Sequence, residues 1–174
     1  LVFLRHAHYQ TQPWDMGIFD QTFWNTVHGR SMQNSIEQIP NHLGVHFAPI
    51  LFFLVPGYAL FPSPYYLLAI QTIALALGAI PVFVLAKILL SSERHALVIA
   101  GGYLLYSVLH GINWFDFHDV AFFVPLFLTA LAFFFSGKLW WTIAFLMLAS
   151  MTQESAPLVV AMFGVLSTVL PKDL

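Results

Sequence analysis

The sequence predicts an all-α protein, a polytopic membrane helical bundle with further helices lying at the external membrane surface. Of its 174 residues, 59% are hydrophobic and only 8% are charged, against about 25% charged in ordinary soluble domains. The mean hydropathy is +0.79. Apolar runs, some of them long enough to cross a bilayer, alternate with short polar gaps. These observations assign the chain to the multi-pass membrane class.

Composition also excludes several kinds of partner and chemistry. The chain has no cysteine, which excludes disulfides, thiol chemistry and cysteine-ligated metals. Its formal net charge is −2, without a basic block, so nucleic acid is not an expected partner. The sequence begins at Leu1 within an apolar run, and we expect a fragment of a larger protein in which residues 1–8 end a first helix.

Residues 9–66 are expected to form an external loop with juxtamembrane helices. A short helix is predicted over Met16–His28, with Asp15 as a possible N-cap and Gly29 as the stop signal. The apolar segment Phe47–Tyr66 contains four prolines, so we expect a re-entrant helix or one lying in the membrane plane. The tryptophans and phenylalanines of the loop suit the bilayer interface.

Residues 67–174 are expected to supply about five transmembrane helices. The first three are predicted over Leu67–Leu90, Ala96–Ile112 and Val120–Gly137, and a helical hairpin follows between Lys138 and Lys172. Because that last interval is shorter than the roughly 40 residues that two full spans need, its turn should lie below the membrane interface.

The charges predict the orientation of the bundle. After residue 66 the basic residues Lys87, Arg94, Lys138 and Lys172 fall in one set of gaps, which the positive-inside rule places in the cytoplasm. The other set holds the turn at residues 113–119, which is therefore external. We expect a multi-pass protein of the plasma membrane whose active face is external or periplasmic, with membrane lipid as a partner.

The polar residues between the apolar runs are the candidate site. Glu154 is the only charge inside the predicted hairpin, and a lipid-facing carboxylate there would cost about 3 kcal/mol or more. Structural roles compete with functional ones for the acids: Asp15 and Asp119 as helix caps, and Asp20 as a solvated surface residue. A divalent metal is a possible cofactor, with the candidate ligands His46, His118 and Asp116.

Several motifs carry a resemblance to a known family. They are W-D-M-G-I-F-D-Q-T-F-W (Trp14–Trp24), H-F-A-P-I-L (His46–Leu51), Y-A-L-F-P-S-P (Tyr58–Pro64), Q-T-I-A-L-A-L-G-A-I-P (Gln71–Pro81), D-F-H (Asp116–His118) and Q-E-S (Gln153–Ser155). In order and spacing this series resembles domain-of-unknown-function family 2079, a group of bacterial and archaeal membrane proteins, over nearly the whole chain. That family is in turn distantly similar to the C-type glycosyltransferase superfold.

The resemblance implies a sugar transferase that uses a polyprenyl-phosphate donor at the external face. Asp15 occupies the place of the superfold's loop acid and Asp116 that of a second acid. The superfold often has two adjacent acids in the loop, but Met16 follows Asp15 and the nearest further acid is Asp20. The resemblance therefore implies a catalytic set drawn from Asp15, Asp20 and Asp116.

The hypothetical mechanism gives each remaining candidate a role. Asp15 would be the general base for the acceptor hydroxyl. The residues expected to bind the substrate are Gln21, Trp24, Arg30, His46, His118 and Glu154, with Arg30 and His46 near the leaving phosphate.

Two alternatives remain open from the sequence. One is a multi-pass transporter or proton-coupled permease in which Glu154 and His118 relay protons. The other is a non-catalytic membrane scaffold that has kept the fold.

Overall fold

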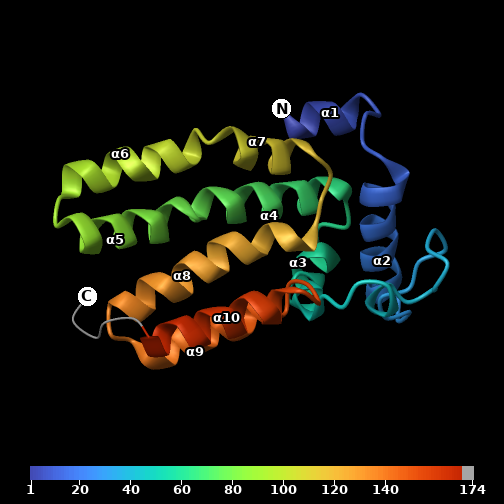
Figure 1. Ribbon diagram of the computed structural model, residues 1–174. Helices are drawn as coiled ribbons and strands as arrows, with labels where there is room; N and C mark the ends of the chain where they lie inside the picture. The colour runs from blue at the N-terminus through green and yellow to red at the C-terminus, as the bar shows by residue number, and fades with distance from the viewer. Residues whose placement is uncertain (170–174) are drawn as a thin grey trace.

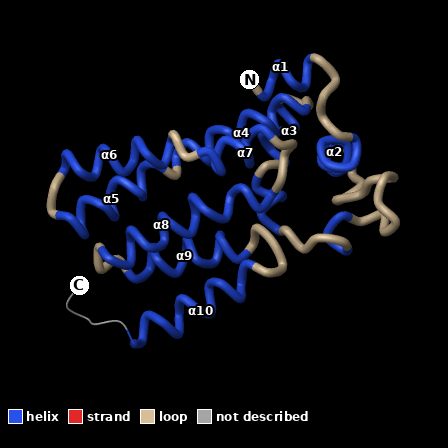
Figure 2. Tube along the Cα trace, turned by 45° about the horizontal axis from the view of Figure 1, so that its top comes forward, coloured by secondary structure: helices blue, strands red, loops and turns tan. Residues whose placement is uncertain are grey.

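The computed structural model describes residues 1–169, and within them the chain is helical without a β-strand. An isolated antiparallel bridge joins Gln33 to Asn41. The long helices lie side by side as a bundle, and the shorter helices α1, α2 and α3 cover one end of it (Figures 1 and 2). The predicted all-α helical bundle is confirmed.

The first half of the chain forms the covering end of the bundle. Helix α1 (Val2–Ala7) is followed by a π-helical turn at Pro13–Gly17, which leads directly into α2 (Ile18–Val27). Asp15 lies inside the π-helical turn, whose N-cap is Gln12, and no side chain caps either element. The interpretation of Asp15 as an N-cap is therefore wrong.

The end of α2 follows the prediction closely. The helix ends at Val27, and Gly29 follows with φ +83°, a left-handed conformation in which glycine avoids the steric cost that other residues meet. Beyond it, residues 30–48 are a long ordered loop with one short 3₁₀ turn at His42–Gly44.

The proline-rich segment breaks into two short helices. A 3₁₀ helix covers Pro49–Phe53 and α3 covers Val55–Leu60, each with proline in its first turn. Proline is favoured there because its missing N–H would have no helical partner. The single helix expected over Phe47–Tyr66 is thus wrong in detail, but the segment stays at the covered end of the bundle (Figure 1).

Within residues 1–169, two helices are long and apolar enough to cross a membrane. One runs from Pro64 to Leu90 and the other from Glu93 to Trp114. The first consists of α4 (Pro64–Leu77) and α5 (Ala79–Leu90) with Gly78 between them. The second consists of α6 (Glu93–Leu104) and α7 (Ser107–Trp114). The Ser63 hydroxyl accepts a hydrogen bond from the Tyr65 N–H where α4 begins.

The remaining apolar helices are shorter. A 3₁₀ turn at Asp119–Phe122 leads into α8 (Phe123–Phe135), and α9 (Leu139–Ser150) and α10 (Ala156–Val169) form the hairpin. The 12 residues of α9 rise about 18 Å at 1.5 Å per residue, well short of a hydrocarbon core of about 30 Å. The 3₁₀ helix Pro49–Phe53 contacts the end of this hairpin, where the Ile50 N–H donates to the Met151 carbonyl at 2.9 Å.

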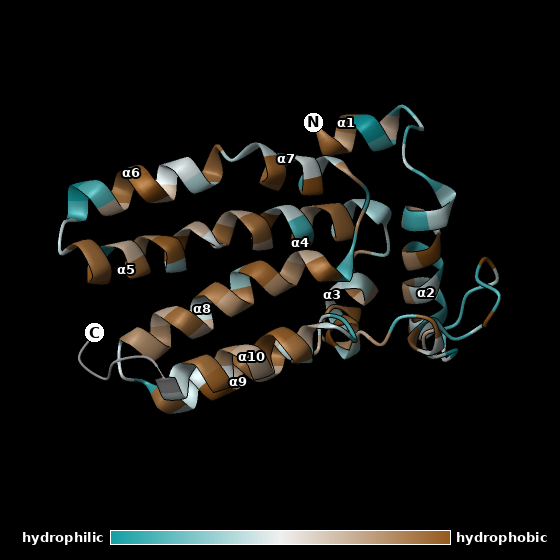
Figure 3. Cartoon of the chain, in the orientation of Figure 1, coloured by the Kyte–Doolittle hydropathy of each residue, from teal (hydrophilic) through white to brown (hydrophobic). Residues whose placement is uncertain are grey.

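The best-packed core lies at the covered end and not along the bundle. Phe23, Tyr58 and Phe117 are nearly or fully buried there together with Leu51 and Leu67. The long helices instead expose large apolar side chains, including Leu97 and Val98 at 60% and 72%, and Figure 3 shows brown along most of their length. An apolar exterior around a bundle is what lipid-facing helices require.

The two ends of the bundle differ in charge. The α5–α6 turn, next to Lys87 and Arg94, and the α8–α9 turn, at Lys138, lie at the end opposite α1, α2 and α3 (Figure 1). Lys172 lies outside the described residues. The covered end holds the acids and histidines discussed next.

Candidate functional site

A pocket of about 170 Å³ opens at the covered end of the bundle. Its lining comes from four separate stretches of the chain: the π-helical turn and start of α2, the loop before α3, the turn before α8, and the α9–α10 turn. The lining residues are Trp14, Asp15, Ile18, Phe19, Glu37, His42, His46, His118, Asp119, Val120 and Gln153. Six of them are acids or histidines, so the pocket concentrates the proton-transferring side chains of this end.

Asp15 and His118 face each other at the pocket. The His118 Nε2 lies 3.4 Å from the Asp15 Oδ1, and both side chains remain about 30% exposed, at 31% and 27%. The other ring nitrogen of His118, Nδ1, donates to the Asp116 carbonyl at 3.1 Å. The His118 backbone N–H donates to the side-chain carbonyl of Gln71, which is fully buried. The imidazole is therefore held in place from the core of the bundle.

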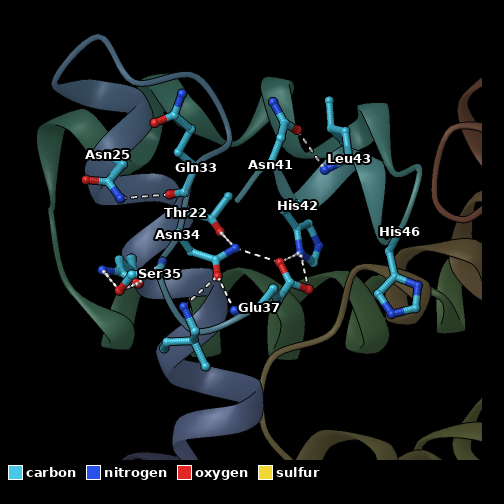
Figure 4. A network of polar contacts seen from close by, with 12 residues as sticks. Thr22, Asn25, Gln33, Asn34, Ser35, Glu37, Asn41, His42, Leu43 and His46 are labelled. Atoms are coloured by element: carbon cyan, nitrogen blue, oxygen red, sulfur yellow. Dashed lines mark hydrogen bonds and ion pairs between the residues drawn. The ribbon is translucent and has the colours of Figure 1, made fainter. Parts of the chain in front are cut away.

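Glu37 and His42 form a second carboxylate–imidazole pair. The Nδ1 of His42 lies 3.1 and 3.0 Å from the two carboxylate oxygens of Glu37. Asn34 holds that carboxylate with an N–H donated at 2.6 Å, and its own carbonyl accepts the Glu37 backbone N–H (Figure 4). A carboxylate behind one nitrogen orients the ring and fixes its tautomer.

Asp119 is the most deeply placed acid of the pocket. Its Oδ1 accepts the Val120 N–H at 2.8 Å, and its side chain is 7% exposed. Burial raises the pKa of Asp119, an effect that the Val120 N–H and the nearby imidazoles of His42, His118 and His46 partly offset.

His46 connects the pocket to the α9–α10 turn. Its Nδ1 lies 3.4 Å from the Glu154 carboxylate, and both side chains are about half exposed, at 54% and 49%. The pKa of Glu154 is lowered, first by its own backbone N–H and then by His46. Glu154 therefore lies in the turn at the end of the hairpin, where its partner is a histidine of the loop.

Asp116 lies beside the pocket but does not line it. Its carboxylate is fully buried, with Oδ1 held by Arg5 and Oδ2 accepting the Gln12 N–H. The backbone carbonyl of Asp116 accepts a hydrogen bond from the Gln71 side-chain amide at 3.4 Å. Asp116 thus ties the N-terminal segment to the turn before α8.

Asp20 is likewise turned away from the pocket. Its Oδ1 accepts the Tyr58 hydroxyl at 2.5 Å, and burial raises the pKa of Asp20 although this hydrogen bond lowers it in part. The interpretation of Asp20 as a solvated surface residue is wrong, since the carboxylate is half-buried between α2 and α3.

The other predicted substrate-binding residues also lie outside the pocket. Gln21 exchanges hydrogen bonds with Ser35 and steadies the loop. Trp24 lies over the ring of His28 at a centroid distance of 4.3 Å, and Arg30 is exposed beyond the end of α2. The structure therefore gathers Asp15, His46 and His118 at one pocket, with Glu154 at its edge through His46.

Three pocket residues escaped the sequence analysis: Glu37, His42 and Asp119. Glu37 and His42 are not among the residues that the sequence marks as candidates, and Asp119 is considered there only as a helix cap. Glu37 and His42 lie five positions apart in an irregular loop, where no helical or strand periodicity predicts that they meet.

The positions of the acids and histidines also bear on metal binding. In residues 1–169 no three acidic or histidine side chains stand close enough together to hold a metal ion. Of the proposed ligands, His46 and His118 share the pocket and Asp116 does not.

The fold and the site define a multi-helix membrane protein with a polar pocket at one end of its bundle. The family model described as predicted membrane protein (DUF2079) matches residues 5–170, and the chain belongs to that family. Neither the comparison with curated proteins nor that with solved structures gives a match.

Proposed function

We propose that this protein is a membrane glycosyltransferase-like enzyme that transfers a sugar from a polyprenyl-phosphate donor at the external membrane face. The observation that carries the proposal is the pocket at the covered end, where Asp15, His118 and His46 come together. A carboxylate and imidazoles at one polar pocket supply the acid, base and hydrogen-bonding groups that glycosyl transfer needs.

The orientation follows from the basic end of the bundle. Lys87, Arg94 and Lys138 lie opposite the pocket, and basic turns favour the cytoplasmic side. The pocket then faces outward across the plasma membrane, where lipid-linked sugars are available to an enzyme without a nucleotide donor.

An apolar groove next to the pocket suits the isoprenoid chain of such a donor. Ile143, Met147 and Val160 line it between α9 and α10, and it extends to Met151. Gln153, two residues further, lines the pocket. A carrier lipid in the groove would place its phosphate and sugar at the pocket.

The chemistry assigned to the pocket is a displacement at the anomeric carbon. An acceptor hydroxyl gives its proton to Asp15 while its oxygen forms the new bond to that carbon. The bond from the anomeric carbon to the phosphate oxygen breaks, and its electron pair leaves with the polyprenyl phosphate. His118 lies beside the Asp15 carboxylate, and His46, half exposed at the rim, is placed to donate to the phosphate.

The test uses the full-length protein in lipid nanodiscs with a panel of polyprenyl-phosphate sugars. Consumption of one donor by the wild type, lost in Asp15→Asn, would support the proposal. The control is Glu93→Gln, an exposed carboxylate at the opposite end of the bundle, which should keep full turnover. Turnover by a folded Asp15→Asn would remove Asp15 as the base. If the folded wild type consumed none of the donors, the proposed function would be wrong.

A further inference from the structure

Two buried polar atoms near the pocket have no hydrogen-bond partner in the described part of the chain. They are the Nε2 of His42 and the Oδ2 of Asp119. Their residues are 1% and 7% exposed, and both line the same pocket. A buried polar atom without a partner costs about 1–3 kcal/mol, so each such atom in a native protein calls for an explanation, such as a bound ligand, an ordered water or a catalytic role.

The surroundings of His42 determine what its free nitrogen offers. Because both oxygens of the Glu37 carboxylate accept from Nδ1, the neutral ring carries its proton there and presents a lone pair at Nε2. The Asn34 side chain keeps Glu37 in place and is itself within 3.3 Å of the Thr22 hydroxyl (Figure 4). Glu37, Asn34 and Thr22 thus fix the orientation of the His42 ring, and His42 lines the pocket.

Asp119 presents a second acceptor. The Val120 N–H occupies its Oδ1, which leaves Oδ2 for a ligand. His42 and Asp119 line the same pocket of about 170 Å³, so one small ligand can reach both. A ligand that satisfies both atoms must bring two hydrogen-bond donors.

The ligand chemistry can be narrowed further. An anionic group is disfavoured, because both free atoms are acceptors and Glu37 and Asp15 add negative charge. A metal ion would need a third ligand, and the described residues offer no such trio. Two hydroxyl groups on adjacent carbons fit, since each O–H can donate to one acceptor. Trp14, 68% exposed at the pocket, adds an aromatic face for the apolar side of a sugar ring.

We propose that His42 and Asp119 form a subsite for a vicinal diol of the sugar, with Glu37 as the positioning residue behind His42. The proposal rests on the proposed function and names which part of the donor or acceptor this side of the pocket recognises. The two free acceptors then bind sugar hydroxyls, and the phosphate binds at the half-exposed His46.

The test measures sugar binding without turnover. Saturation-transfer NMR on the full-length protein in nanodiscs would compare a methyl pyranoside with free 2- and 3-hydroxyls with its 2,3-dideoxy analogue. We expect the dideoxy sugar to bind about tenfold or more weakly, because two buried acceptors then stay unpaired. His42→Ala and Asp119→Ala should each remove most of that preference, whereas His28→Ala, an exposed histidine outside the pocket, should retain it.

The outcomes separate this proposal from the proposed function. An unchanged preference in both folded pocket variants, or no preference in the wild type at tens of millimolar sugar, would overturn the diol subsite. Donor turnover that depends on Asp15 would still stand in that case. A clear diol preference without turnover of any lipid-linked sugar would instead support the subsite and overturn the transferase. Glu37→Gln adds a further readout, since a positioning role predicts weaker binding of the diol sugar and no change for the dideoxy analogue.

Discussion

Arg5 and Asp116, 111 positions apart in the chain, form a buried ion pair in which the Arg5 Nη1 lies 2.5 Å from the Asp116 Oδ1. Arg5 also donates to the Trp114 carbonyl at 2.8 Å. The side chains are 11% and 0% exposed, so water contributes little to their solvation. The pair fixes α1 to the turn that carries His118, and it thereby helps to position the pocket.

Removing the cation of this pair should destabilise the protein strongly. Arg5→Met leaves the Asp116 carboxylate buried without a countercharge, which costs about 3–5 kcal/mol. The double variant Arg5→Met, Asp116→Asn should recover part of that loss, because the remaining buried group is then neutral. Thermal unfolding in detergent measures the stability of both variants.

Arg94→Met, which changes an exposed arginine at the opposite end of the bundle, is the control and should change stability by no more than about 0.5 kcal/mol. Additive losses in the double variant would contradict the pairing.

The contact between Tyr58 and Asp20 predicts a pH dependence. Burial raises the pKa of Asp20 above the 3.8 of the free group, so the folded protein holds this proton more tightly than the unfolded chain does. Stability contributed by the protonated carboxyl is complete below pH 3.8 and is lost as the pH rises through the higher folded pKa. Unfolding followed from pH 3 to pH 7 should show a smaller decline for Asp20→Asn than for the wild type.

Tyr58→Phe should have the opposite effect to Asp20→Asn on the pH dependence of stability. The Tyr58 hydroxyl donates to the ionised carboxylate and lowers its pKa in part. Without this donor the pKa of Asp20 rises further, and the decline in stability should extend to higher pH. Identical profiles for the wild type, Asp20→Asn and Tyr58→Phe would show that Asp20 does not titrate differently in the folded state.

The sequence predicted the bundle well because the bilayer constrains helices so strongly. The predicted spans Leu67–Leu90 and Ala96–Ile112 fall within Pro64–Leu90 and Glu93–Trp114, since hydropathy and the charged gaps define such segments. Both helices begin three residues earlier than predicted, where Ser63 and Ser92 cap them. Serine caps of this kind can be recognised in a sequence.

The site was harder to predict, because its residues meet through contacts remote in sequence. Asp116 was expected at the reaction centre, but the buried Arg5 and the Gln12 N–H occupy its carboxylate. Arg5 lies 111 positions away, and no periodicity connects the two. The pairing of His42 with Glu37 depends on the folded shape of the loop that carries both residues. Irregular loops owe their shape to such specific hydrogen bonds and not to a repeating pattern.

Gly78 allows a close approach between two helices. A Cβ placed there would clash with the Tyr103 hydroxyl, which donates to the Leu75 carbonyl at 2.9 Å. Gly78→Ala should therefore displace Tyr103, lose that hydrogen bond and cost about 1–3 kcal/mol. Gly101→Ala is the matched control, because a Cβ there meets nothing within 4 Å. It should leave the thermal midpoint unchanged or higher, as alanine favours helix. Equal effects of the two substitutions would contradict this packing.

The pair between His46 and Glu154 should contribute little to stability, in contrast to Arg5 and Asp116. Both side chains are about half exposed at a separation of 3.4 Å, and pairs with this exposure usually contribute about 0–1 kcal/mol. Glu154→Gln should therefore unfold within about 0.5 kcal/mol of the wild type, as measured by thermal unfolding in detergent, with Arg5→Met as the contrasting variant. A loss comparable to that of Arg5→Met would mean that Glu154 is buried in the membrane-embedded protein, as a proton relay requires. A small loss would place the carboxylate at the hydrated rim of the pocket, where it can adjust His46 but cannot carry protons through the bundle.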